Sequence, residues 1–303
     1  MEDVGQHISW GWEIAVYLFL GGLAAGTLCA VAIINLVTGE RFKNTIRFGA
    51  WFGAIALAVG VSFLLLESGV PFRALILYQS FVNFNSWMAL GAWLLLIGIF
   101  IYAVYALSCT DWVTRKVRPL LKIRTVLAII VVPLSVSIAA YTGVLLSVLW
   151  ARPFWNTWFL PALFTVSAFD TGVALVTAYA TLREFKEGVA RLKRILEASI
   201  VILVALEGTI LGFYLGTMLS SDSEAAVLSA QVLTEGSQSQ YFWFIVIGLG
   251  LAIPFLASIL LLIRSNLAQK TKYILPVVGV LSCLAGGFTL RLVILAAGLP
   301  IYT

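Results

Sequence analysis

Eight long apolar runs are the feature of this 303-residue sequence that most restricts its fold. They cover roughly residues 12–37, 46–67, 86–107, 124–149, 159–182, 195–219, 241–263 and 273–297. Each run can cross the hydrocarbon core of a bilayer as a helix, which takes about 20 residues. The runs are unbroken instead of alternating over about 10 residues, and this argues against a transmembrane β-barrel. The sequence therefore predicts an all-α integral membrane protein with eight transmembrane helices, arranged as two packed four-helix bundles.

The residues outside these runs are too few for a separate extramembrane domain. Charged residues make up 11% of the chain and hydrophobic residues 61%, whereas about 25% of a soluble protein is charged. We predict a single membrane domain over residues 1–303, with an outer loop at residues 220–240 that is rich in Ser, Gln and acids. The acidic start and the long first run predict no cleavable signal peptide.

The basic residues predict the orientation of the helices. The segments around the ends of the first, third, fifth and seventh runs carry three, five, five and three of the 19 Lys and Arg residues. Arg73 and Arg152 lie on the opposite side, and Arg291 lies inside the eighth run. The positive-inside rule therefore places both termini on the non-cytoplasmic side. This asymmetry accounts for the net charge of +5 without nucleic-acid binding, because no loop mixes its basic residues with aromatic ones.

The sequence is poor in the ligands that metal cofactors need. Haem b is held by axial ligands, generally histidines of facing helices, and the one histidine is His7, ahead of the first run. Cys29, Cys109 and Cys283 lie far apart and form no CxxC pair, so we predict packing roles for them and no iron–sulfur or zinc site in this chain. Any redox function must use a diffusible organic carrier or the cofactors of a partner.

Polar side chains near the outer ends of the runs form a first candidate site. Ionisable groups inside a membrane cost about 2.5 to 3.5 kcal/mol on insertion scales, so they tend to face a bundle interior or a water path. Helix counting places several such groups at similar depths, and we expect them to converge on one site that faces outward. Alternatively, the acids are interfacial and the tyrosines belong to an aromatic belt. The candidates are Glu13, Tyr17, Glu67, Tyr141, Arg152, Asn156 and Arg291.

Two further acids, Asp170 and Glu207, fall near the middle of the membrane by the same counting. An isolated ionised carboxylate is strongly disfavoured there, so we expect both acids to be protonated at rest. Together with Arg291, they predict a proton path toward the cytoplasmic side. Alternatively, each acid is only hydrogen-bonded to a nearby hydroxyl group such as that of Ser167 or Thr171.

Small residues at helical spacing predict close helix packing. Gly22 and Gly26 form a GxxxG pair in the first run, and Gly208, Gly212 and Gly216 form a longer stripe in the sixth. Such residues let two helix backbones approach each other in a membrane. We expect both groups to pack against neighbouring helices and not to bind a ligand.

Two stretches at the outer face resemble the NrfD family, which includes the polysulfide reductase membrane subunit. The first is WEIAVYLFLGGLAAG at 12–26, and the second extends from AYTGVLL at 140–146 to ARPFWN at 151–156. The match in number and order of runs covers nearly the whole chain. Further family features are Gly91, Ala92 and Trp93, and Glu67 before a loop that carries Phe72 and Arg73.

This resemblance implies a haem-free subunit of a prokaryotic cytoplasmic membrane that exchanges electrons between menaquinone or ubiquinone and a ferredoxin-like iron–sulfur subunit on the outer face. A molybdopterin catalytic subunit would lie beyond it. In the polysulfide reductase member, a tyrosine of the fourth span, matched here by Tyr141, holds the quinone head together with a histidine and an asparagine of the first span. This sequence has Tyr17 and Ile14 at those two positions. The second carbonyl contact therefore passes to Tyr17, Glu13 or a water.

A quinone site needs hydroxyl donors for the quinone oxygens and an acid or base for the protons. We assign the donors to Tyr141 and Tyr17 and the proton exchange to Glu13 or Glu67, with Arg152 and Asn156 beside the quinone head.

Two other functions remain open for this sequence. One is a structural or proton-conducting subunit of a respiratory complex without its own quinone site, in which Asp170 and Glu207 carry the function. The other is a proton-coupled solute transporter, which is disfavoured because paired broken helices are not evident. Pro133 and Pro254 interrupt the fourth and seventh runs, and proline kinks explain both.

Overall fold

The computed structural model describes residues 11–39, 41–67, 86–117, 119–184, 190–264 and 268–300. All regular elements in these ranges are helices, and eight helical segments are long and apolar enough to cross a membrane. This confirms the prediction of an all-helical chain with eight candidate spans. The elements are α1 (Trp12–Thr38), α2 (Lys43–Glu67), α4 (Trp87–Ser108), α5 (Asp111–Lys116), α6 (Pro119–Ser147), α7 (Phe159–Arg183), α8 (Ala190–Leu219), α9 (Glu224–Thr234), the π-helix η2 (Tyr241–Ala252), α10 (Ile253–Ile263) and α11 (Gln269–Ala297).

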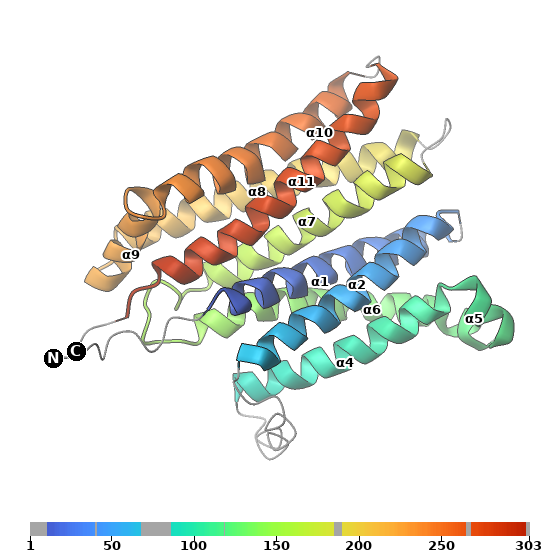
Figure 1. Cartoon of the computed structure of the whole chain (residues 1–303), viewed down its shortest axis with the longest axis horizontal. Coiled ribbons are helices and arrows are strands. Elements are labelled where there is room, and N and C mark those ends of the chain that lie inside the picture. The colour runs from blue at the N-terminus through green and yellow to red at the C-terminus, as the bar shows by residue number, and fades with distance from the viewer. Residues whose placement is uncertain are drawn as a thin grey trace.

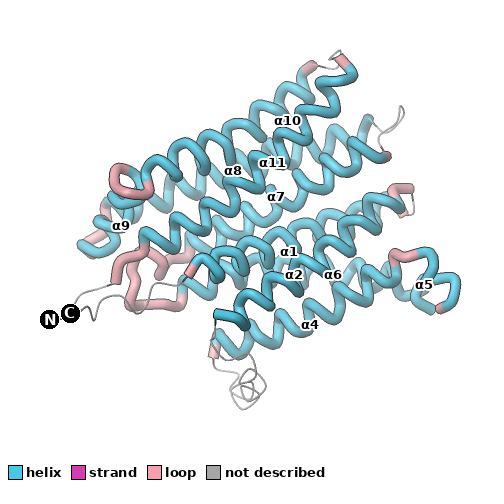
Figure 2. The backbone as a smooth tube through the Cα atoms, in the orientation of Figure 1, coloured by secondary structure: helices cyan, strands magenta, loops and turns pink. Residues whose placement is uncertain are grey.

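The spans lie in two groups, which Figure 1 shows one above the other. Helices α1, α2, α4 and α6 pack together in the lower group, and α7, α8, α10 and α11 pack together in the upper one. The groups meet where α1 and α6 contact α7. Helix α1 is the most buried of the eight spans. The connections lie at the two ends of the helices, as Figure 2 shows, so the polar groups in the middle of the spans face other helices or lipid.

Glycine contacts hold α1 against α7 at the junction of the two groups. A Cβ atom on Gly26 would overlap the backbone of Ala168, and one on Gly172 would overlap the backbone of Gly26. At Gly22, a Cβ would lie 3.2 Å from the Cβ of Ala168. The packing role predicted for Gly22 and Gly26 is therefore confirmed, and Gly172 is the partner that the sequence did not identify.

The glycine stripe of α8 does not pack in the way that we predicted. Gly212 and Gly216 are exposed, and a Cβ atom on either would meet nothing within 4 Å among the described parts of the chain. Gly208 has one ordinary contact, with the Leu251 side chain at 3.8 Å. The prediction was wrong for Gly212 and Gly216 because spacing along a helix does not reveal which face a neighbour covers.

The segment predicted as an outer loop, residues 220–240, contains helix α9. Ala226, Ala230 and Leu233 are buried on one face of this helix, as their helical spacing allows. The helix contacts α8, α11 and η2. The backbone N–H of Leu299 donates a hydrogen bond to the Ser229 hydroxyl over 2.9 Å. Helix α9 therefore covers one end of the upper group, and its hydrogen bond to Leu299 holds the segment after α11 in place.

The seventh span changes its helix type near Pro254. Residues Tyr241–Ala252 form a π-helix and Ile253–Ile263 an α-helix, with the N–H of Ile253 bonded to the carbonyl of Gly248, five residues earlier. In the wide part of this span, a Cβ atom on Gly250 would lie only 2.7 Å from the Cα atom of Gly286 in α11. The two backbones thus approach closely beside the acids of the upper group. Proline lacks the N–H that would continue the ladder, so the change of helix type falls where the sequence suggested a kink.

Candidate functional site

Tyr141 lies in the C-terminal half of α6, where its ring packs against α4. A Cβ atom on Gly91 would overlap this ring, so any residue larger than glycine at position 91 would displace it. The side chain of Tyr141 is 8% exposed. The Gly91 that marks the family resemblance in the third span therefore makes the space in which Tyr141 lies.

Tyr17 lies on α1 and is completely buried. Its hydroxyl has no hydrogen-bond partner within the described ranges, and it interacts electrostatically with Tyr141. The Tyr17 ring and the methyl group of Thr142 both face Gly21, at 3.9 and 3.6 Å from the place that a Cβ atom would take there. A buried hydroxyl without a partner costs about 1 to 3 kcal/mol. Tyr17 thus offers an unused donor close to Tyr141.

Of the two acids predicted for this site, the structure describes the side chain of Glu13 but not that of Glu67. Glu13 is partly exposed in the first turn of α1, and Ile14 beside it is buried. Glu67 is the last residue of α2, and its side chain lies outside the described part of the structure. His7 and the loop with Phe72 and Arg73 also lie outside it.

Arg152 and Asn156 hold the connection between α6 and α7 in place. Arg152 donates from Nη1 to the Gly298 carbonyl over 2.5 Å, and its guanidinium lies 4.4 Å from the centre of the Trp155 ring. Asn156 donates from Nδ2 to the Ser147 carbonyl over 2.5 Å. These contacts connect this segment to the ends of α11 and α6, so both residues fix the position of the α6–α7 connection.

The deep acids Asp170 and Glu207 lie around one small cavity of the upper group. Asp170 is 1% exposed and Glu207 4% exposed, and about 10 Å³ of free volume lies between α7, α8, η2 and α11, enough for about one water molecule. The Cys283 thiol donates to Oδ2 of Asp170 over 2.7 Å, whereas Oδ1 has no partner in the described structure. Glu207 bonds to the Ser167 hydroxyl. Cys283, predicted as a packing residue, is thus also a hydrogen-bond donor to an acid.

Arg291 lies with these acids and is completely buried. It donates from Nη1 to the Gly287 carbonyl over 2.6 Å and to the Ser167 hydroxyl over 3.3 Å, and it interacts electrostatically with Glu207. Its Nη2 lies 3.0 Å from the place that a Cβ atom of Gly22 would take on α1. We call Ser167, Asp170, Glu207, Cys283 and Arg291 the deep cluster.

Helix α1 connects the two candidate sites. Gly22, which faces Arg291, follows Tyr17 by five residues, a rise of about 7.5 Å along the helix. The Phe19 ring between them lies 5.7 Å from the Arg291 guanidinium. The outer tyrosines and the deep cluster are therefore neighbours along one buried helix.

The three cysteines are free and separate. Cys109 lies just beyond the end of α4, where burial raises the pKa of its thiol, so the thiol stays protonated near neutral pH. No group of three or more His, Cys, Asp and Glu side chains that could hold a metal ion occurs in the parts of the chain described above.

Comparison with known proteins identifies the family. The sequence model of the family described as "Polysulphide reductase, NrfD" matches residues 2–302. The chain belongs to the NrfD family. This NrfD-family protein is 30% identical to the C subunit of the polysulfide reductase of Wolinella succinogenes, over 96% of its own length and 94% of the relative. It is 28% identical to protein NrfD of Escherichia coli, over 83% of its own length and 84% of the relative.

A third relative is less similar to this chain. The Hdr-like menaquinol oxidoreductase integral membrane subunit of Archaeoglobus fulgidus is 23% identical, over 84% of this chain and 63% of the relative. The resemblance inferred from the two outer stretches is thereby confirmed. With its eight apolar helices, the NrfD-family chain is a multi-pass integral membrane protein.

One buried acid of the NrfD-family chain, Glu197, is not recognisable as buried from the sequence. It lies two residues inside the predicted start of the sixth run, where an acid normally reaches water. In the structure it is 2% exposed, and its Oε1 has no described hydrogen-bond partner. The signal in the sequence is its position in the first turns of a span, flanked by Leu196 and Ala198.

Proposed function

We propose that this chain is the haem-free, quinone-reactive membrane subunit of a respiratory oxidoreductase. It exchanges electrons between menaquinone or ubiquinone and a ferredoxin-like iron–sulfur subunit on its outer face, with a molybdopterin catalytic subunit beyond. The observation that carries this proposal is the buried Tyr17 hydroxyl beside Tyr141, which has no hydrogen-bond partner among the described residues. Relatives that are named as subunits of a polysulfide reductase and of a menaquinol oxidoreductase support it.

The residues of the outer site fit a quinone head. A quinol gives up two electrons and two protons on oxidation, so its two oxygens need hydrogen-bonding groups and a route for protons. The Tyr141 and Tyr17 hydroxyls would hold these oxygens, and Glu13 or Glu67 would exchange protons with the outer water. Arg152 and Asn156 hold the connection that borders the site, through the contacts with Gly298 and Ser147 described above.

In this proposal the deep cluster carries protons. It contains two carboxyl groups and one guanidinium, and a buried charge is stable only when it is paired. Overall neutrality then requires one carboxylate and one carboxylic acid, so that Asp170 and Glu207 share one exchangeable proton while Arg291 keeps its charge. The proximity of Arg291 to α1 gives this proton a route toward the outer tyrosines.

The two helix groups are two four-helix bundles, with both termini on the non-cytoplasmic side of a prokaryotic cytoplasmic membrane. We expect a tag at the C-terminus to be labelled by a membrane-impermeant reagent in intact spheroplasts, and a cysteine placed at Lys270 to be labelled only after lysis. The physical reason is the excess of Lys and Arg around the ends of the first, third, fifth and seventh runs, which the positive-inside rule places in the cytoplasm. If the cysteine at position 270 were labelled before lysis and the C-terminal tag were not, the orientation would be the opposite of the one proposed.

Tyr141→Phe tests the quinone site. The ring still packs on Gly91 and only the hydroxyl is lost, so we expect quinol turnover by the purified complex to fall about three- to tenfold, since one hydrogen bond is worth about 0.5 to 1.5 kcal/mol. The complex should still isolate with its iron–sulfur subunit. Tyr102→Phe is the matched control, because Tyr102 is a buried tyrosine of α4 whose hydroxyl pairs with Ser135 at 2.8 Å. Quinol kinetics that are equal in wild type and Tyr141→Phe contradict the proposed site.

One observation favours a second candidate function. The deep cluster combines two buried acids, a buried positive charge, hydrogen bonds from Cys283 and Arg291, and a water-sized cavity. A proton-conducting subunit without its own quinone site would need this cluster alone. Tyr17→Phe and Tyr141→Phe variants with wild-type quinol turnover, together with an Asp170→Asn variant that loses proton movement, would support this second function.

A further inference from the structure

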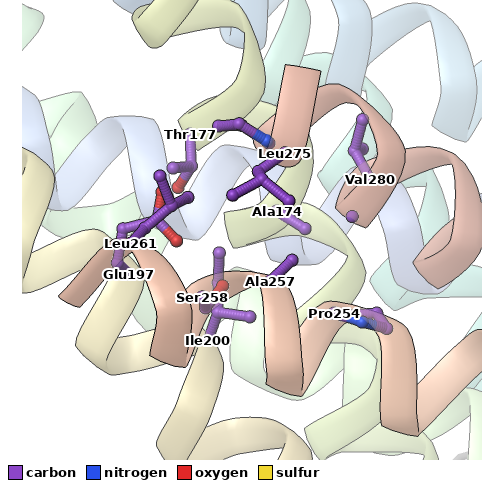
Figure 3. Close-up of a pocket in the computed structure, with 12 residues that line it drawn as sticks. Ala174, Thr177, Glu197, Ile200, Pro254, Ala257, Ser258, Leu261, Leu275 and Val280 are labelled. Carbon is purple, nitrogen blue, oxygen red and sulfur yellow. The ribbon is translucent and has the colours of Figure 1, made fainter. Parts of the chain in front are cut away.

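A second cavity lies in the upper group, and its lining is drawn in Figure 3. Along α8 and α11 it lies between the deep cluster and the ends that carry Arg191, Lys193 and Lys272. It is enclosed by α7, α8, α10 and α11 and has about 10 Å³ of free volume, again enough for about one water molecule. Its polar lining consists of Glu197, Thr177 and Ser258, which Figure 3 shows around the same space. The remaining lining is apolar or glycine, as in a dry helix interface.

Glu197 is a buried acid in a mostly apolar interface between helices. Its side chain is almost completely buried and Oε1 has no described partner, whereas the carboxyl group also bonds to the Ser258 hydroxyl. Lys193 lies one helical turn nearer the end of α8 and interacts electrostatically with Glu197, and Lys272 of α11 faces Lys193. A buried carboxyl group that lines a water-sized space can bind and release a proton through a water in that space.

An apolar layer separates this cavity from the deep cluster. Ala174, Ile200 and Val280 line the cavity of Glu197 and pack in one cluster with Val204 and with Cys283, the thiol that bonds to Asp170. Glu197 and Glu207 are ten residues apart on α8, a rise of about 15 Å. Thr177 of the cavity follows Asp170 by seven residues on α7, about 10 Å. The two polar cavities thus lie in line along the same three helices.

We propose that Glu197 is the group that loads the deep cluster with protons from the cytoplasmic side. This inference rests on the proposed function, and it adds the entry point of the path. Glu197 takes one proton from cytoplasmic water and passes it, through water molecules that enter the apolar layer, to the carboxylate of the Asp170–Glu207 pair. Each transfer breaks one O–H bond and forms another, no electron moves, and the Glu197 carboxylate that remains is protonated again from the cytoplasm. Lys193 stabilises this carboxylate between two transfers.

Glu197→Gln in the whole complex tests the proposal. The amide keeps the volume and the bond to Ser258 but cannot carry a proton, so proton uptake per quinol turnover in proteoliposomes should fall about tenfold. Quinol turnover measured with an uncoupler should stay within about twofold of wild type. The control is Asp111→Asn, because Asp111 is an exposed acid of α5 that lies 4.0 Å from Arg47. Wild-type proton uptake in Glu197→Gln would overturn the proposal.

Two comparisons keep the test decisive. Asp170→Asn tests the deep cluster separately. If proton uptake is lost in Asp170→Asn but not in Glu197→Gln, Glu197 is not the entry point, and the proton path through the deep cluster stands. If both variants take up protons as wild type does, the path itself is refuted. If the Glu197→Gln complex does not assemble, Glu197→Asp is the variant to measure instead. It keeps an acid in the cavity but withdraws it by one methylene, so the rate of proton uptake should fall about threefold to tenfold. A wild-type rate in that variant also contradicts the proposal.

Discussion

Gly172→Leu is expected to remove the folded protein from the membrane. The Cβ atom of any larger residue at this position would overlap the backbone of Gly26 and Thr27 on α1, and backbone atoms cannot move aside as a flexible side chain does. Overpacking of an interior costs about 1 to 3 kcal/mol where neighbours can adjust. Here α1, the most buried span, and α7 would have to separate, and with them the two helix groups. The measurement is the amount of monodisperse protein that a mild detergent extracts.

Gly212→Leu is the matched control for this substitution. Gly212 is also a glycine inside an apolar span, but it is exposed on α8 and a Cβ atom there meets nothing within 4 Å in the described structure. The extracted amount should therefore equal that of wild type. A normal yield of Gly172→Leu would show that the α1–α7 crossing is looser than the glycine contacts indicate, and a loss in Gly212→Leu would reveal a neighbour on that face of α8.

The pair Gly172 and Gly212 also shows which parts of the fold follow from the sequence. The eight spans are predictable because each is a local property, an apolar run longer than the membrane core. The packing of Gly22 and Gly26 is a local pattern as well, but their partner Gly172 lies far away in the sequence. The stripe of Gly212 and Gly216 has the same spacing and packs against nothing described. Spacing gives the face of a helix, and only the arrangement of the other helices decides whether that face is covered.

The candidate sites show the same limit. Counting along a helix gives the depth of Arg291 but not its direction around the axis, so the sequence grouped it with the outer site as well as with the proton path. The structure brings it to Ser167, beside Glu207. A lone thiol usually has a packing role, so the sequence alone does not predict the hydrogen bond from Cys283 to Asp170. The position of Glu197 near the start of its run predicts contact with water, whereas residues of α10 and α11 border its side chain in the structure.

Asp170→Asn is expected to uncouple the complex while leaving quinol chemistry possible. The amide oxygen still accepts the hydrogen bond from Cys283, and the amide nitrogen replaces the oxygen that has no described partner, so the packing of α7 against α11 is kept. The variant cannot share a proton with Glu207, and Arg291 then has Glu207 as its one carboxylate in the deep cluster. Because this carboxylate must stay ionised to pair with the guanidinium, the cluster no longer cycles between two protonation states. Protons moved per quinol should fall about tenfold.

The measurement is proton movement per quinol turnover in proteoliposomes that hold the whole complex, with turnover under uncoupled conditions as the second readout. Thr165→Val is the matched control on the same helix, since the Thr165 hydroxyl bonds to the Pro161 carbonyl of its own helix at 2.6 Å. It should leave both readouts unchanged. Glu207→Gln should resemble Asp170→Asn if the two acids share one proton, because removing either acid leaves a single carboxylate with the guanidinium. Full coupling in both amide variants would mean that the deep cluster only balances the charge of Arg291 and that protons cross the membrane elsewhere.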